Sequence, residues 1–497
     1  MQGGFIWDWV DQGLDKVNDQ GRHFWAYGGD YGVNTPSDNN FLCNGIVGPD
    51  RNPHPAHAEV AHVYQDIAVE PTDDKSEYTA WNRFYFNDLT GYELRWTLLR
   101  DGRAVKRGAQ RFTTAPQQRE KLSVQLPKLL PASEYLITFD WVCVADGLLR
   151  PAGSVVASDQ FTIQEDNRAA RTKAKGKVEV TERKGQIVLR SAKSEMTIDT
   201  EKGLITSIKV AGRERLTAPV QPSFWRAPTD NDYGNGQPLR AQIFKQNERR
   251  FTTTVKARQT DNGAEVVIDY ALPSKNPCTL TCTMGTDGVI LFDLDFKGVA
   301  SEKPIDVPRV GLKMQLPAAA DAFRYYGRGP GENYCDRFSG SNVGIYDSSA
   351  EAEYYPYVRP QECGHHTGCR WIQIGDVTFI AADKSFEFNA LRQTTDDLDS
   401  EESKHDYQWS NRTANEKHDP AAAENRLRRQ HHIDDVEVCD FVELHLDAGM
   451  SGVAGYDSWG SLPEPGRTLW SNRDYRLRVA MVPSRDAEKA ARFNYAE

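Results

Sequence analysis

Residues 252–272 read TTTVKARQTDNGAEVVIDYAL, and this stretch indicates the fold class most directly. Apolar and polar side chains alternate through it, and a period of two is typical of strands with one buried face. Asn262-Gly263 separates the two alternating runs, and Asn-Gly at such a place is a strong signal for a β-hairpin. The stretch therefore predicts two antiparallel strands within a β-rich domain.

The same pattern continues on both sides of this hairpin. Residues 185–200 and 289–296 also alternate, and Lys202-Gly203 and Asp287-Gly288 supply further turn signals. A large β domain over residues 178–497 is the prediction.

A second β domain is predicted upstream. Residues 66–166 contain short alternating runs such as YELRWTLL and YLITFDWVCV, separated by turn dipeptides at Asp101-Gly102 and Asp146-Gly147. About a hundred residues with this pattern are typical of a β-sandwich. Residues 167–177, NRAARTKAKGK, lack large apolar side chains and predict a linker.

Residues 1–65 have a different character, with many glycines, acidic residues and aromatics that indicate loops on a scaffold. The apolar run Gly3 to Trp9 predicts a buried strand, and AEVAHVYQDI predicts a short helix with Val60 and Val63 on one face. A strand so close to Met1, without the features of a signal peptide, suggests that the chain begins inside a larger protein.

Composition excludes several classes of function. Sixty Lys and Arg against seventy-one Asp and Glu give a net charge of −11, which argues against nucleic acid as a partner. No run of about 18 apolar residues is present, so a membrane span is not expected. Eight cysteines in 497 residues are too few for a disulfide scaffold. Their number leaves the redox compartment open; we expect a cytoplasmic protein, with the periplasm as the alternative.

The sequence offers only weak candidates for catalytic carboxylates. Hydrolysis of a glycosidic bond commonly uses two carboxylates, and Asp8 and Asp11 are near enough in sequence to suggest them. Acidic residues in such a turn more often cap backbone amides. Asn247-Glu248 and Asn415-Glu416 lie in charged sequence and not at the end of an apolar strand, which disfavours an acid/base role.

Two groups of residues could bind zinc, and each has a simpler interpretation. The first is His54, His57, Glu59 and His62, whose spacing is not HExxH. The second is Cys363, His365, His366 and Cys369 in CGHHTGC, which could instead form a hairpin turn with incidental Cys and His.

Aromatic residues in polar, glycine-rich surroundings are the remaining signal. They are Trp7, Trp9, Phe41 and Trp459. Sugar rings have apolar faces that stack on aromatic side chains, while their hydroxyls need polar partners, so these settings favour carbohydrate recognition.

Several motifs together resemble the carboxy-terminal half of the large β-galactosidases of glycoside hydrolase family 2. They are GFIWDWVDQG at 4–13, FWRAPTDNDYG at 224–234, YYGRGPGENYCDR at 325–337, YPYVRPQECG at 355–364 and GVAGYDSWG at 452–460. Their order and rough spacing cover essentially the whole chain.

The resemblance implies a mainly β chain with a defined domain order. Residues 1–65 would form the end of the catalytic (β/α)8 barrel, and residues 66–166 an immunoglobulin-like β-sandwich. Residues 178–497 would form the large, galactose-mutarotase-like β-sandwich of the family.

The resemblance also implies roles for individual residues. Trp7 would lie under the galactose, and Trp459 would line the aglycone side. The backbone carbonyl of Phe41 and the side-chain carbonyl of Asn44 would bind Na+. Both catalytic glutamates, and most ligands of a Mg2+ (or Ca2+) site, would lie upstream of Met1. No family role is implied for the residues of CGHHTGC.

Two hypotheses follow. In the first, the chain is part of a retaining β-galactosidase acting on terminal β-D-galactosides such as lactose, inactive by itself, with the missing amino-terminal half as a partner. In the second, it is a non-catalytic carbohydrate-binding or structural β protein. Homo-oligomerisation is left open by the sequence.

Overall fold

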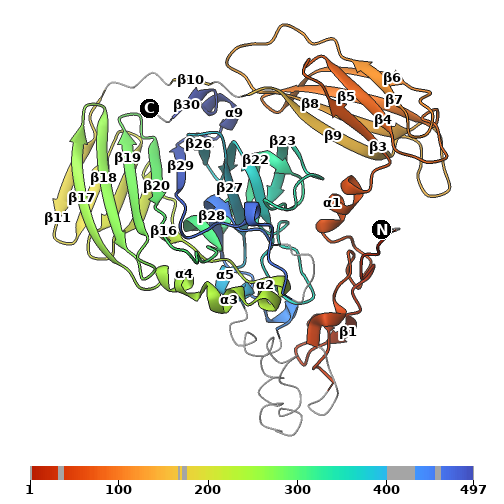
Figure 1. The fold of residues 1–497 in the computed structure, drawn as a ribbon. Coiled ribbons are helices and arrows are strands. Elements are labelled where there is room, and N and C mark those ends of the chain that lie inside the picture. Colours follow the sequence, from red (N-terminus) through yellow and green to blue (C-terminus); the bar gives the residue numbers. More distant parts are fainter. Residues whose placement is uncertain are drawn as a thin grey trace.

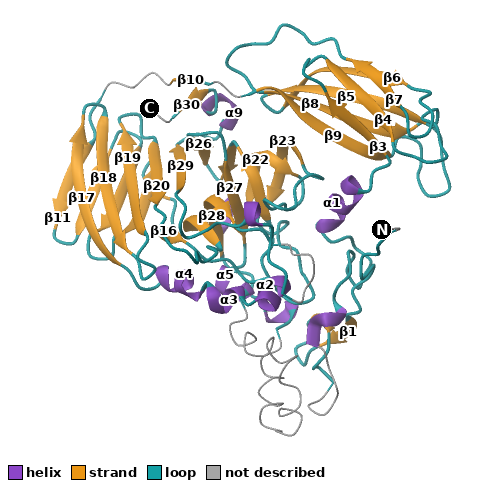
Figure 2. Cartoon of the chain, viewed as in Figure 1, coloured by secondary structure: helices purple, strands orange, loops and turns teal. Residues whose placement is uncertain are grey.

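The structure, a computed structural model, describes residues 3–31, 39–165, 168–170, 176–399, 431–453 and 460–495. The chain is mainly β, as predicted, and contains a small sandwich, a large sandwich and an amino-terminal segment (Figure 1). The helices are short, and several gather at one end of the large sandwich (Figure 2).

Two long sheets form the large sandwich. In spatial order, the first contains β11 (Glu179–Arg183), β12 (Gln186–Arg190), β13 (Ser194–Asp199), β14 (Leu204–Val210), β16 (Ala218–Ser223), β21 (Arg309–Pro317), β28 (Phe441–Met450), β27 (Phe386–Leu391) and β24 (His365–Cys369), with β15 (Arg213–Glu214) beside β14. The second contains β17 (Thr252–Thr260), β18 (Gly263–Ala271), β19 (Pro277–Gly285), β20 (Ile290–Phe296), β29 (Tyr475–Val482), β26 (Val377–Ala381), β25 (Trp371–Ile374), β22 (Ala322–Gly329) and β23 (Asn342–Ser349).

The predicted hairpin of residues 252–272 is confirmed. β17 and β18 pair antiparallel, and Thr260 opposite Gly263 leaves Asp261 and Asn262 as the turn. Gly263 is therefore the first strand residue. A Cβ there would lie 2.1 Å from the carbonyl oxygen of Met284 on β19, so glycine permits the close approach of these strands.

The core of the large sandwich lies between its two sheets. Alternate residues of β18, β19 and β20 are buried, including Ile268, Leu280 and Phe292. Three short helices, α2 (Asp230–Asn235), α3 (Gln237–Arg240) and α4 (Gln242–Asn247), follow β16. The Thr229 hydroxyl accepts a hydrogen bond from the backbone amide of Asp232, and this cap fixes where α2 begins.

The small sandwich consists of a sheet of β3 (Ile67–Pro71), β4 (Glu77–Asn82) and β7 (Arg119–Ser123), and a sheet of β6 (Arg103–Arg111), β5 (Tyr92–Arg100), β8 (Tyr135–Cys143) and β9 (Val155–Gln164). Trp141, Tyr78 and Phe139 are buried in its core. It contacts the large sandwich through the Gln160 side chain, which donates to the Val343 carbonyl at 2.9 Å and accepts from the Val343 amide at 2.8 Å.

The amino-terminal segment corrects one prediction. Gly3 to Trp9 is not a buried strand: Phe5 is fully exposed and Trp7 is 78% exposed. An apolar run becomes a buried strand only when neighbouring strands pair with it along its length. Here only the end of the run is paired: the Asp8 amide donates to the Asn44 carbonyl at 2.8 Å, and the Trp9 carbonyl accepts from the Val47 amide at 3.1 Å. Further on lie β1 (Leu14–Val17), β2 (His23–Ala26), η1 (Asn39–Leu42) and the predicted helix, α1 (Ala56–Val63).

Within the predicted linker, Ala169–Ala170 forms the short strand β10, which pairs in parallel with β30 (Phe493–Asn494) near α9 (Ala487–Ala490). The short helix α5 (Thr395–Leu398) follows β27, and residues 400–430 lie outside the described part. Among the described helices, none is long and apolar enough to cross a membrane.

Candidate functional site

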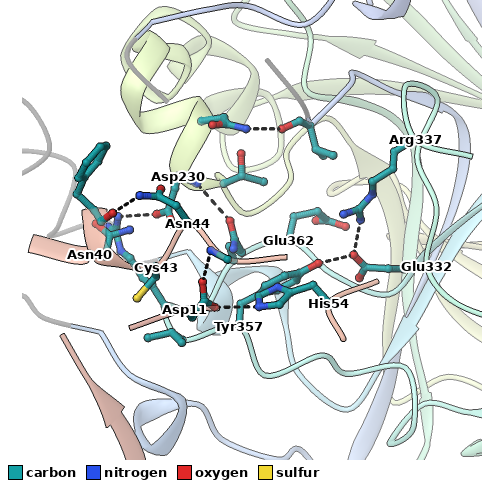
Figure 3. Close-up of a pocket in the computed structure, with 18 of the residues that line it drawn as sticks. Asp11, Asn40, Cys43, Asn44, His54, Asp230, Glu332, Arg337, Tyr357 and Glu362 are labelled. Atoms are coloured by element: carbon teal, nitrogen blue, oxygen red, sulfur yellow. Dashed lines mark hydrogen bonds and ion pairs between the residues drawn. The ribbon is translucent and has the colours of Figure 1, made fainter. Parts of the chain in front are cut away.

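A pocket of about 270 Å³ lies between the amino-terminal segment and one end of the large sandwich (Figure 3). Its lining comes from five stretches that are distant in sequence: Trp7 to His54, Thr229 to Asn231, Glu332 to Arg337, Tyr357 to Glu362, and Val453. Motifs quoted for the family resemblance supply the last four stretches and the beginning of the first. Segments far apart in the chain thus form one concave polar site.

Asp11 organises the amino-terminal side of the pocket. Its carboxylate lies 2.8 Å from His54 Nε2 and accepts a hydrogen bond from the backbone amide of Gly45 at 2.7 Å. A Cβ at Gly45 would lie 2.1 Å from the Asp11 backbone nitrogen, so only glycine allows this approach. Because Asp11 is 3% exposed and already bonded, its role here is to hold the loop.

The structure brings three predicted site residues to this pocket. Phe41 and Asn44 lie in one loop that lines the pocket, and the Asn44 side-chain amide donates a hydrogen bond to the Phe41 carbonyl oxygen. Trp7 lines the same pocket with most of its ring exposed. Trp459 lies outside the described residues, although Val453, six residues before it, lines the pocket.

The sandwich side contributes charged residues that the sequence did not identify as site residues. Arg359 Nη1 lies 3.1 Å from Asp230 Oδ1, and the Asp230 carboxylate also bonds to the Asn40 side chain on the opposite wall. Burial raises the pKa of Asp230, and the neighbouring Asp11 adds to this, whereas Arg359 opposes it. The hydrogen bond between Asp230 and Asn40 ties the beginning of α2 to the turn that carries Phe41.

A second group on the same side is centred on Glu332. Its carboxylate accepts hydrogen bonds from the Tyr357 hydroxyl at 2.7 Å, the Arg337 guanidinium at 2.5 Å and the Gly364 amide at 2.7 Å. Burial, and then the Glu332 charge, raise the pKa of Tyr357 well above its usual range. The phenol is therefore a neutral donor across the ordinary pH range.

Glu362 also lines the pocket. Its side chain accepts a hydrogen bond from Asn389 at 2.9 Å and lies 3.6 Å from Arg309, a buried guanidinium. Because all four acidic side chains of the pocket have such partners, the rim is polar and preorganised.

The predicted alternatives for metal binding do not converge in the structure. His62 contacts the Ser158 carbonyl, Glu59 accepts from the Gly340 amide, and His54 contacts Asp11. Among the described residues, one group has ligand atoms close enough together for a metal ion. It consists of His432, Asp434 and Asp435, none of which lines the pocket.

The CGHHTGC stretch is not a hairpin turn, which corrects the simpler interpretation. His365–Cys369 is the buried strand β24. His365 contacts Asn389 and Glu387, and His366 contacts Glu353 at 2.8 Å, so both imidazoles are bonded within the protein. Burial raises the pKa of the Cys363 and Cys369 thiols well above the usual range, as expected for inert core cysteines.

Asn247-Glu248 is also placed by the structure. Glu248 is bonded to Lys313 at 2.7 Å and to the backbone amides of Phe224 and Trp225, away from the pocket. Asp8 bonds to Gln12 on the exposed segment, and Asn415-Glu416 lies outside the described residues.

Comparison with known proteins agrees with this fold. Residues 190–481 match the family model for the β-galactosidase small chain, residues 78–164 match β-galactosidase domain 4, and residues 1–69 match the TIM barrel domain of family 2 glycosyl hydrolases. These three matches, in this order along the chain, define a component of a glycoside hydrolase. The chain belongs to the family 2 β-galactosidases and corresponds to a carboxy-terminal portion of them.

Individual relatives show the same relationship. A β-galactosidase of Priestia megaterium is 29% identical over 97% of this chain and 45% of its own length. One of Vibrio vulnificus is 29% identical over 97% of this chain and 46% of its own length. The chain thus spans about half the length of the curated relatives it matches. A putative aldose 1-epimerase from Escherichia coli K12 aligns with 61% of this chain and 98% of its own, at TM-score 0.31 and 7% identity.

Proposed function

We propose that this chain is part of a retaining β-galactosidase that hydrolyses terminal β-D-galactosides such as lactose, and that the pocket receives the galactosyl unit. The observation that carries this proposal is the meeting of Trp7, Phe41 and Asn44 with the charged residues of the sandwich in one pocket. An exposed indole offers an apolar face to the sugar ring, and the polar rim offers donors and acceptors to its hydroxyls.

The catalytic carboxylates, in this proposal, come from sequence outside this chain. Retaining hydrolysis requires a nucleophilic carboxylate and an acid/base carboxyl about 5–5.5 Å apart. The pocket's acidic side chains are bonded to arginine, histidine, tyrosine, amide or backbone partners, as Asp11 is to His54. Such groups are held in place and are poorly suited to attack a sugar. The half-length match to the relatives supports the same division.

A sodium ion is proposed between Phe41 and Asn44. A half-turn of the Asn44 amide would replace its nitrogen by its carbonyl oxygen beside the Phe41 carbonyl, and this pair of uncharged oxygens suits a hard cation. Na+ would orient a sugar hydroxyl there. The Mg2+ (or Ca2+) site of the intact enzyme is proposed to use ligands mostly outside this chain.

The cytoplasm is the proposed location. All eight cysteines are free thiols in the structure, and this state fits a reducing compartment.

Reconstitution tests the proposed function. The purified chain is mixed with the amino-terminal half of the Priestia megaterium relative, and release of the aryl group from an aryl β-galactoside is measured. We expect turnover by the mixture and a large loss with Trp7→Ala, while Trp470→Ala, an indole outside the pocket, serves as the control. Association of the halves with galactoside binding but without turnover would favour the non-catalytic carbohydrate-binding alternative.

A further inference from the structure

A second cavity, of about 540 Å³, lies where the small sandwich meets the large one. One wall comes from the turn between β5 and β6, at Arg100 to Arg103, and from the loop Leu130 to Glu134. The opposite wall comes from Tyr326 on β22, Trp371 on β25 and residues in and after α9. Its volume is within the range of small-molecule sites, and it lies apart from the galactoside pocket.

The floor of this cavity is a buried and fully bonded ion pair. Glu134, 3% exposed, accepts hydrogen bonds from Arg370 at 2.5 and 3.1 Å and from the Tyr326 hydroxyl. A second pair, Arg103 with Glu488, links the small sandwich to α9 at the rim, with Nε and Oε2 3.0 Å apart. Two of the cavity's three acidic residues are thereby neutralised.

The remaining charges leave the cavity positive. Five arginines and three acidic residues line it, an excess of two positive charges in a chain whose net charge is −11. Arg168 donates to the carbonyls of Ala381 and Asp383. The side chains of Arg100 and Arg492 form no hydrogen bond or ion pair with the described part of the chain, so both guanidiniums can bind an anion.

The cavity also has an apolar side. Leu130, Pro131 and Ala132 face it from the small sandwich, and Trp371 and Ala491 from the large one. A ligand that uses both sides therefore combines an anionic group with a larger organic body. Guanidinium groups match phosphate oxygens in geometry and are weakly hydrated, which favours a phosphoryl group as the anion.

We propose that this interdomain cavity binds a phosphorylated, sugar-sized molecule, with its phosphoryl group between Arg100 and Arg492. Because the two arginines belong to different sandwiches, the bound molecule fixes the two domains relative to each other. A ligand that binds only this folded arrangement raises its stability through mass action.

The test uses the purified full chain and isothermal titration calorimetry with glucose 6-phosphate, inorganic phosphate and glucose at constant ionic strength. We expect glucose 6-phosphate to bind at least tenfold more tightly than inorganic phosphate, and glucose not to bind. Arg100→Ala/Arg492→Ala should weaken binding of glucose 6-phosphate at least tenfold. The control Arg107→Ala/Arg183→Ala, which removes two exposed arginines outside the cavity, should bind as the unmodified chain does.

Several results would overturn the proposal. They are absence of binding by the unmodified chain, equal affinity for inorganic phosphate and glucose 6-phosphate, and equal losses in the two double variants. Circular dichroism verifies that each variant is folded, and Arg492→Gln alone provides a milder change that should still weaken binding.

Discussion

His432 Nε2 lies 2.9 Å from Asp30 Oδ2, and this contact joins the large sandwich to the amino-terminal segment across 402 residues of sequence. The Tyr27 ring packs against the same imidazole at 4.8 Å between centroids, and its hydroxyl donates to the His431 carbonyl at 2.9 Å. The segment that carries the amino-terminal wall of the pocket is thus held by a histidine that can change its charge.

The first prediction concerns pH. Burial alone would lower the pKa of His432, but Asp30 and Asp435 raise it to about 9. Since the folded state favours the protonated form, this stabilisation is fully present below about pH 6.5 and is lost as pH rises through about 9. Hydrogen exchange of residues 14–31, corrected for intrinsic rates, should show opening easier by about 3 kcal/mol above pH 9 than below pH 6.5.

His432→Gln is the control for this effect. It cannot take up a proton, so the hairpin of β1 and β2 should open equally easily at both ends of the pH range. If the unmodified chain shows no change across this range, His432 does not govern docking of the segment.

The second prediction concerns Asp232, whose carboxylate makes a bidentate pair with Arg226 at 2.6 and 3.0 Å. Arg226 is completely buried and also donates to the Gly452 carbonyl, next to the pocket residue Val453. Asp232→Asn leaves a buried guanidinium without its counter-charge, and we expect a loss of about 3–5 kcal/mol in the free energy of unfolding of the large sandwich.

An exposed pair of the same geometry provides the matched control. Arg324 and Asp347 are also bidentate, at 2.6 and 2.8 Å, but Arg324 is partly exposed and Asp347 is largely exposed. Asp347→Asn should cost less than about 1 kcal/mol in urea unfolding. Similar losses for the two substitutions would show that burial is not what makes the Arg226 pair matter.

The third prediction concerns Asn44 in the reconstituted enzyme. Asn44→Ala removes one of the two proposed sodium ligands, so KM for the aryl galactoside should rise roughly 10-fold, the effect of losing about 1.4 kcal/mol of binding. The dependence of KM on the Na+ concentration should also disappear in this variant. Asn52→Ala, which removes an exposed asparagine bonded to Asp50, should leave both unchanged. Undiminished sodium dependence in Asn44→Ala would refute the assignment.

The sequence predicted those features that depend on local order. Turn dipeptides and alternating runs predicted the hairpin of β17 and β18, and Asp101-Gly102 marked the turn between β5 and β6. The resemblance named Trp7, Phe41 and Asn44, and all three line one pocket in the structure, while their roles stay predictions. Domain boundaries and the role of Trp459 stay predictions.

The features that were missed depend on contacts between distant residues. Asp230 and Arg359 are 129 residues apart, and although each lies in a quoted motif, nothing local to either residue shows that the two meet. The sequence could not decide whether His365 binds zinc, because the partners that occupy its imidazole, Asn389 and Glu387, come from the neighbouring strand β27. The prediction of a buried strand over Gly3 to Trp9 was wrong because an apolar run shows the tendency to form a strand but not whether a partner strand exists along its length.

The most direct test of the account is to locate the catalytic nucleophile by covalent labelling. The reconstituted enzyme is inactivated with a 2-deoxy-2-fluoro-galactosyl fluoride, which accumulates the glycosyl-enzyme of a retaining hydrolase, and the labelled residue is identified by peptide mass spectrometry. We expect a 2-deoxy-2-fluorogalactosyl adduct on a glutamate of the amino-terminal half and none on this chain. An adduct on Asp8, Asp11, Glu332 or any other carboxylate of this chain would contradict it.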